Sequence, residues 1–138
     1  MTNRTVLIVD DERDTADVLG LLLTGLGFRA LVSYSGAEAI AIAGRERPDV
    51  AIIDLAMPEV CGLDVARAVR AEAWGQSMLL IAVSGFTRPE DRFAALYAGF
   101  DHFFPKPCSL DDVLEALPID CRIAEDSILR LGNPPGFA

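Results

Sequence analysis

The chain alternates between short, nearly continuous apolar runs and longer segments whose apolar residues recur at helical spacing. Short apolar runs bounded by polar residues are typical of strands buried on both faces of a parallel sheet. They predict five strands, at Thr5–Val9, Phe28–Tyr34, Val50–Ile53, Met78–Val83 and His102–Phe104. Between these strands, apolar residues recur at helical spacing and predict five helices, at 14–26, 36–45, 62–73, 89–98 and 110–117. Ser35 and Ser109 are the expected N-caps of the second and fifth helices.

Strict alternation of strands and helices defines the expected fold class as α/β. Right-handed crossover connections place such a (βα)5 chain in a doubly wound, five-stranded parallel sheet covered on both faces. The length of 138 residues suits one such domain, which we expect over 1–118. Residues 119–138 are expected to form a C-terminal tail, with one short extra helix over 123–131 followed by a disordered end rich in glycine and proline.

Composition narrows the function classes. The net charge of −9 disfavours nucleic acid as a partner, because phosphates would be repelled. Three scattered cysteines do not make a disulfide framework and indicate reduced thiols in a cytoplasmic protein. The first apolar run, Val6–Val9, is too short for a signal peptide or a membrane span. We therefore expect neither nucleic acid nor membrane as a partner.

Polar residues with complementary chemistry follow four of the five predicted strands. They are Asp10 with Asp11, Asp54, Ser84 and Lys106. Because the carboxyl ends of parallel strands meet at one edge, these distant residues are expected to form one site. Three carboxylates, a hydroxyl and an ammonium group suit a divalent cation and a phosphoryl group. Alone, the acidic pair could cap a helix and Asp54 could form a structural ion pair with Lys106.

Several stretches together resemble the receiver domain of bacterial two-component response regulators. The matching motifs are VLIVDDE at 6–12, IDLAMP at 53–58, VSG at 83–85, AGFD at 98–101 and FFPKP at 103–107. They occur in the order typical of that family, and the resemblance covers roughly residues 5–118. It implies a flavodoxin-like sheet of strand order 2-1-3-4-5.

The resemblance assigns chemical roles to the strand-end residues. Asp54 would be the nucleophile that accepts a phosphoryl group from the phosphohistidine of a sensor histidine kinase or of a histidine phosphotransfer protein. Mg²⁺ would be held by Asp10, Asp11, Asp54 and the backbone carbonyl of Ala56. Lys106 would pair with Asp54 and later with a phosphoryl oxygen. The chemistry would be limited to self-phosphotransfer and autodephosphorylation, so an enzyme acting on other substrates is not expected.

The resemblance also implies a conformational switch and a readout. Ser84 would move toward the phosphoryl group and Phe103 would fill the space that it leaves. The Lys106–Pro107 peptide bond is expected to be cis. The output surface would be the fourth helix, fifth strand and fifth helix. The residues after Leu117 are too few for a DNA-reading domain, so we expect action through protein contacts, as a stand-alone regulator or as the receiver of a hybrid histidine kinase.

Two other classes of protein place acidic or phosphate-binding residues at the same strand ends. A Mg²⁺-dependent phosphohydrolase with an aspartyl nucleophile needs a second acid two residues after the first, where this chain has Ala56. A flavin-binding electron carrier needs a phosphate-binding loop after the first strand, where this chain has acidic residues at 10–14. Ala56 and Phe86 also leave no acid or amide beside the phosphoacceptor, which predicts slow loss of the phosphoryl group.

Overall fold

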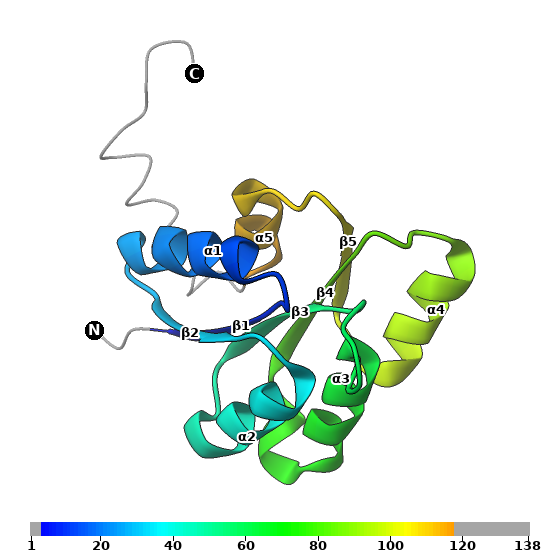
Figure 1. Cartoon of the computed structure of the whole chain (residues 1–138). Coiled ribbons are helices and arrows are strands. Elements are labelled where there is room, and N and C mark those ends of the chain that lie inside the picture. Colours follow the sequence, from blue (N-terminus) through cyan, green and yellow to red (C-terminus); the bar gives the residue numbers. More distant parts are fainter. Residues whose placement is uncertain (1–3, 118–138) are drawn as a thin grey trace.

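A computed structural model shows an open α/β sheet and describes residues 4–117 (Figure 1). Five parallel strands lie in the order β2-β1-β3-β4-β5, so the predicted fold class and strand order are confirmed. The strands are β1 Thr5–Val9, β2 Arg29–Ser33, β3 Val50–Asp54, β4 Leu79–Ser84 and β5 His102–Pro105. The α-helices are α1 Arg13–Gly25, α2 Gly36–Glu46, α3 Gly62–Ala71, α4 Pro89–Ala98 and α5 Leu110–Ala116.

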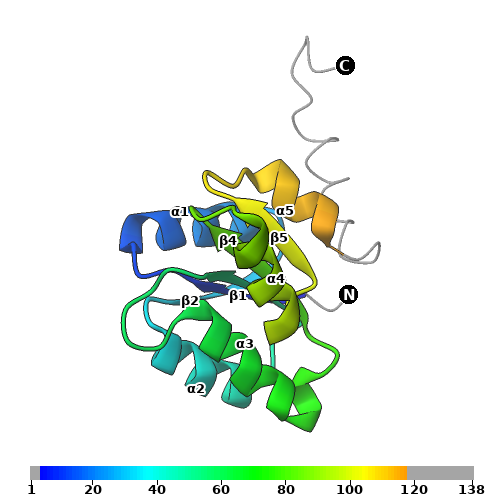
Figure 2. The same cartoon turned by 90° about the vertical axis from the view of Figure 1, so that its right-hand side faces the viewer.

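The sheet lies between two layers of helices, with α2, α3 and α4 on one face and α1 and α5 on the other (Figures 1 and 2). An apolar core fills the space on each side of the sheet. Alternate residues of β1 point to opposite faces, so Leu7 packs against α2 and α3 while Ile8 packs under α1 and α5. Helix α4 completes the first of these layers through Ala95 and Ala98. Because the central strands β1, β3 and β4 are covered on both sides, their apolar residues form continuous runs rather than alternating ones.

The predicted elements differ from the observed ones mainly at their ends. Helix α3 ends at Ala71 and a 3-10 helix follows at Ala73–Gly75. Hydrogen bonds from the Arg70 side chain hold this segment in place. Its guanidinium donates hydrogen bonds to four backbone carbonyls, those of Gly75, Gln76, Met78 and Gly99. These bonds join the end of α3 to the turns that lead into β4 and β5. The tail and extra helix predicted for 119–138 lie outside the described residues.

Helix α1 contacts the sheet through a face of small residues. Ala16, Gly20 and Leu23 are buried, whereas Val18 and Leu22 remain 54% and 47% exposed. A Cβ atom on Gly20 would lie 2.9 Å from Val32 Cγ2, so glycine permits this close approach. The apolar spacing that predicted the helix therefore identified its buried side only in part, through Leu19, Leu23 and Leu26.

Candidate functional site

The carboxyl ends of β1, β3 and β5 bring three acidic residues and one lysine together. Asp10 follows β1, its backbone N–H donating to Ser33 O at 3.1 Å, and Asp54 is the last residue of β3. The backbone N–H of Lys106 continues the β4–β5 pairing by donating to Ser84 O at 2.9 Å. The topology thus joins residues that lie far apart in the sequence, as the strand-end argument predicted.

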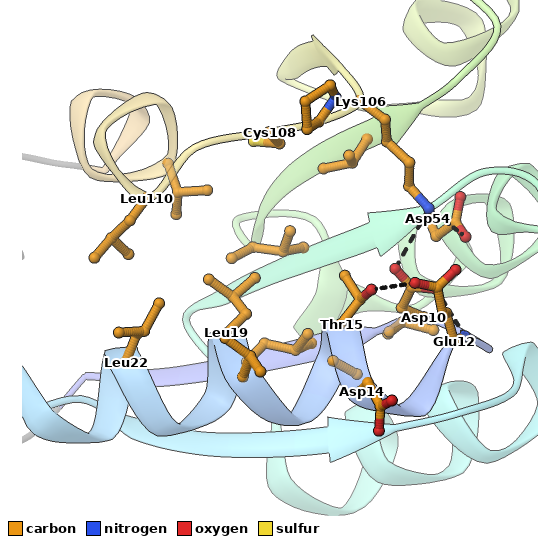
Figure 3. A pocket seen from close by; sticks show the side chains of 18 residues that line it. Asp10, Glu12, Asp14, Thr15, Leu19, Leu22, Asp54, Lys106, Cys108 and Leu110 are labelled. Atoms are coloured by element: carbon orange, nitrogen blue, oxygen red, sulfur yellow. Dashed lines mark hydrogen bonds and ion pairs between the residues drawn. The ribbon is translucent and has the colours of Figure 1, made fainter.

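Lys106 bridges the two buried carboxylates (Figure 3). Its Nζ donates to Asp54 Oδ2 at 3.1 Å and to Asp10 Oδ2 at 3.4 Å. The other oxygen of each carboxylate accepts a backbone hydrogen bond, from Ala56 N–H to Asp54 at 3.1 Å and from Glu12 N–H to Asp10 at 2.9 Å. Each carboxylate is therefore fixed in orientation from both sides.

The electrostatics of the site are dominated by burial of negative charge. Burial raises the pKa of Asp54, which is 4% exposed; Lys106 and the Ala56 N–H oppose this shift and the charge of Asp10 adds to it. For Lys106, burial lowers the pKa, but the hydrogen bonds and charges of Asp54 and Asp10 together outweigh it and raise the pKa. Lys106 therefore remains protonated. Its single positive charge does not balance the negative charges of the carboxylates around it.

Asp11 supplies the third carboxylate. It is exposed, and one of its oxygens lies within 4.8 Å of an oxygen of Asp10 and of Asp54. Oxygens bound directly to one Mg²⁺ lie at most about 4.2 Å apart, so carboxylates within 4.8 Å of one another can hold the ion directly or through water. Hard carboxylate oxygens and a surplus of negative charge suit a divalent cation that prefers oxygen ligands.

The loop after Asp54 returns closely along the end of β3. A Cβ atom on Gly62 would lie 2.5 Å from the backbone carbonyl oxygen of Asp54 and 2.8 Å from Leu55 Cα. Glycine is therefore required at the start of α3, and it allows the 55–61 loop to lie close to the end of β3. The backbone of Ala56 is in this way fixed next to the carboxylates.

Ser84 and Phe103 lie on adjacent strands near this edge. Ser84 is buried at the end of β4, where its Oγ accepts a hydrogen bond from Phe86 N–H at 3.0 Å. Phe103 is half-buried on β5, opposite Ala82. The peptide bond between Lys106 and Pro107 is cis.

Sequence reasoning missed one neighbour of this pair. The guanidinium of Arg92, on α4, lies 4.8 Å from the centre of the Phe103 ring, a cation–π contact. Nothing in the sequence marks this arginine, because the contact depends on how α4 packs beside β5.

Comparison with known proteins agrees with this geometry. The pattern of the response regulator receiver domain matches residues 6–118, so the chain belongs to that family. It is 39% identical over 110 residues to the "Probable transcriptional regulatory protein TcrX" of Mycobacterium tuberculosis, covering 80% of this chain and 46% of that protein. It is 37% identical over 102 residues to a 14.6 kDa protein of Leptolyngbya boryana, covering 74% and 78%.

Solved structures share the fold. The chemotaxis response regulator CheY4 of Vibrio cholerae superposes with a TM-score of 0.78 at 27% identity, covering 84% of this chain and all of that one. The receiver domain of the sensor histidine kinase PA1611 of Pseudomonas aeruginosa has a TM-score of 0.75 at 26% identity, covering 91% and 97%. That structure contains a magnesium ion in its active site cleft. The chain spans just under half the length of TcrX and of the response regulators MprA that it matches.

Within residues 4–117, no helix combines the length and the apolar character that crossing a membrane requires.

Proposed function

We propose that this domain is a phosphorylation-dependent switch in which Asp54 accepts a phosphoryl group from a phosphohistidine. The donor would be a sensor histidine kinase or a histidine phosphotransfer protein. A carboxylate oxygen of Asp54 attacks phosphorus, and the bond from phosphorus to the donor nitrogen breaks. The electron pair of that bond stays on the imidazole, which then takes up a proton from solvent.

The observation that carries this proposal is the position of Asp54 between Lys106 and two other carboxylates. The Asp54 carboxylate is almost fully buried but lies at the open end of β3, with Lys106 Nζ 3.1 Å from Oδ2. A structural ion pair would need only these two residues. Asp10 and Asp11 add repulsion that nothing in the fold requires, and such repulsion is tolerated where a cation and a phosphoryl group are bound.

The residues present fit a magnesium ion. Asp10, Asp11 and Asp54 would hold it, together with the backbone carbonyl of Ala56, which the 55–61 loop keeps beside them. When bound, Mg²⁺ would neutralise the oxygens of the incoming phosphoryl group and so lower the barrier to attack by an anion. Lys106 is placed to pair with a phosphoryl oxygen once Asp54 is phosphorylated, since its ammonium group already contacts that carboxylate.

The proposed conformational switch and output surface involve residues next to the acidic site. A phosphoryl oxygen would offer the Ser84 hydroxyl a charged acceptor, drawing it from its present contact with Phe86 N–H. Phe103, on the next strand, would then turn inward. The output surface proposed is that of α4, β5 and α5, where Phe93, Leu96 and Tyr97 are exposed and available to a protein partner.

The test is intact-mass analysis after incubation with acetyl phosphate. We expect one phosphoryl adduct that needs Mg²⁺ and is absent in Asp54→Asn. Asp64→Asn is the matched control, because Asp64 is an exposed carboxylate on α3 that pairs with Arg67, outside the site. An adduct that persists in Asp54→Asn, or one that forms equally in the presence of a chelator, would overturn the proposal.

A further inference from the structure

Two arginines of α4 differ in the kind of group that they contact. Arg88, which caps the start of the helix, pairs with the carboxylates of Glu90 and Asp91. Arg92 makes no ion pair within the described part of the chain, although the protein carries a net charge of −9. Its guanidinium lies over the ring of Phe103, 4.8 Å from the ring centre. An aromatic ring, rather than a carboxylate, is therefore the partner of this arginine.

The contact joins α4 to β5 at a small open pocket. This pocket has a volume of about 180 Å³ and is lined from both elements, by Arg92 and Leu96 on the helix and by Phe103 on the strand. Asp101 also lines it, but the Asp101 carboxylate pairs with Arg70. The face of an aromatic ring carries partial negative charge and attracts a cation. The guanidinium of Arg92 therefore stabilises the ring where it now lies.

The register of β4 and β5 places Phe103 and Ser84 on the same face of the sheet. Phe103 lies opposite Ala82, and both belong to the core that α4 covers. Because side chains alternate between the faces along a strand, Ala82 and Ser84 point to the same side. Space that opens when Ser84 shifts toward Asp54 is therefore on the side of the sheet where the Phe103 ring already lies.

We propose that Arg92 is a positioning residue that holds the Phe103 ring in its present place and so biases the switch toward the unphosphorylated state. This role rests on the proposed function, because it concerns the ring movement that phosphorylation of Asp54 would cause. An inward turn takes the face of the ring away from the guanidinium, so the cation–π attraction is lost in the switched state. A contact present in one state alone shifts the equilibrium toward that state.

The size of the bias follows from the exposure of the contact. Arg92 is an exposed residue of α4, and a cation–π contact at an exposed site changes an equilibrium constant by about two- to fivefold. Removing the contact should raise the population of the switched state by this factor, provided that the resting arrangement predominates. By linkage, a ligand that binds only the switched state should then bind more tightly by the same factor.

The probe for this shift is beryllofluoride with Mg²⁺, an analogue of the phosphoryl group that binds an aspartate carboxylate reversibly. Fluorine NMR on the full chain gives its dissociation constant from the fraction of bound fluoride. We expect Arg92→Gln, which removes the charge but keeps a good helix former, to lower the dissociation constant about two- to fivefold. Arg92→Lys keeps a cation and should stay closer to the native value. Arg67→Gln is the matched control, because Arg67 is an exposed arginine of α3 that pairs with Asp64, and it should leave the constant unchanged.

A second measurement separates the charge contact from simple packing. Introducing 3,4,5-trifluorophenylalanine at position 103 removes most of the negative charge from the ring face with little change in ring size. With Arg92 present, this change should lower the dissociation constant of beryllofluoride as Arg92→Gln does. In the Arg92→Gln chain it should have no further effect. If the two side chains only packed together, the affinity would not depend on the charge of the ring face.

The outcomes distinguish this role from the proposed function. An unchanged or weaker affinity for beryllofluoride in Arg92→Gln would overturn the role of Arg92 and leave the proposed function intact. A fluorination effect of the same size with and without the arginine would also overturn that role. A native chain that binds no beryllofluoride would overturn the proposed function, and the role of Arg92 with it.

Discussion

Replacing Asp54 by asparagine is expected to stabilise the metal-free protein. At an effective dielectric constant of about 20, the attraction of Lys106 Nζ for Asp54 Oδ2 at 3.1 Å is about 5 kcal/mol. On the same scale, repulsion across 4.8 Å or less is at least about 3.5 kcal/mol from Asp10, and the exposed charge of Asp11 contributes less because water screens it. Attraction and repulsion therefore nearly cancel. The free-energy cost of desolvating the buried Asp54 charge, several kcal/mol per ion, is then not compensated.

The asparagine side chain removes that charge while keeping a similar shape. Because its amide also loses hydration on burial, we expect a net gain in the free energy of unfolding of about 1–2 kcal/mol at neutral pH. The assay is urea denaturation with a chelator present, followed by circular dichroism. Asp64→Asn, which removes a surface carboxylate paired with Arg67, should change stability by no more than about 0.5 kcal/mol.

The pH dependence of this difference has a definite sign. The folded-state pKa of Asp54 is raised above its unfolded value, so the folded protein binds the proton more tightly than the unfolded chain. The native chain therefore gains stability from this group as pH falls through the folded pKa toward the unfolded value. The advantage of Asp54→Asn should be full at neutral pH and shrink on acidification. A variant less stable than the native chain at neutral pH, or an advantage that grows in acid, would refute the reasoning.

Three further predictions follow from the site and the core. Free Mg²⁺ at 100 times its dissociation constant should stabilise the native chain by about 2.7 kcal/mol in thermal or urea unfolding. This gain should be lost in Asp11→Asn, and a full gain there would exclude that residue as a ligand. Arg70→Ala should lower the free energy of unfolding by about 2–4 kcal/mol, because four carbonyls lose a charged donor; a loss below about 1 kcal/mol would contradict this. The phosphorylated protein should lose its phosphoryl group slowly, because Ala56 offers no polar side chain to position water. The aspartyl phosphate of the Ala56→Asn variant should hydrolyse faster. A half-life of seconds for the native chain in a mass-spectrometric time course would contradict that prediction.

The sequence predicted the sheet and the strand-end cluster because both depend on simple, local signals. Continuous apolar runs identify buried strands, and parallel topology then brings Asp10, Asp54 and Lys106 to one edge without any knowledge of side-chain packing. The predicted ends of the strands and helices were less accurate. Hydrogen bonds from outside the element decide where it stops, as Arg70 does for α3.

Packing that depends on small residues or on distant partners could not be predicted in this way. The buried face of α1 is made by Ala16, Gly20 and Leu23, and the first two carry little apolar signal. The exposed Val18 and Leu22 carry a strong one.

The central claim is that Asp54 carries the phosphoryl group. Borohydride reduction of the phosphorylated protein converts an aspartyl phosphate into homoserine, which peptide sequencing by mass spectrometry locates to one residue. We predict homoserine at position 54 only, and only when Mg²⁺ was present during phosphorylation. Homoserine at position 10 or 11, or a stable phosphoryl group on another side chain with Asp54 unmodified, would contradict the account.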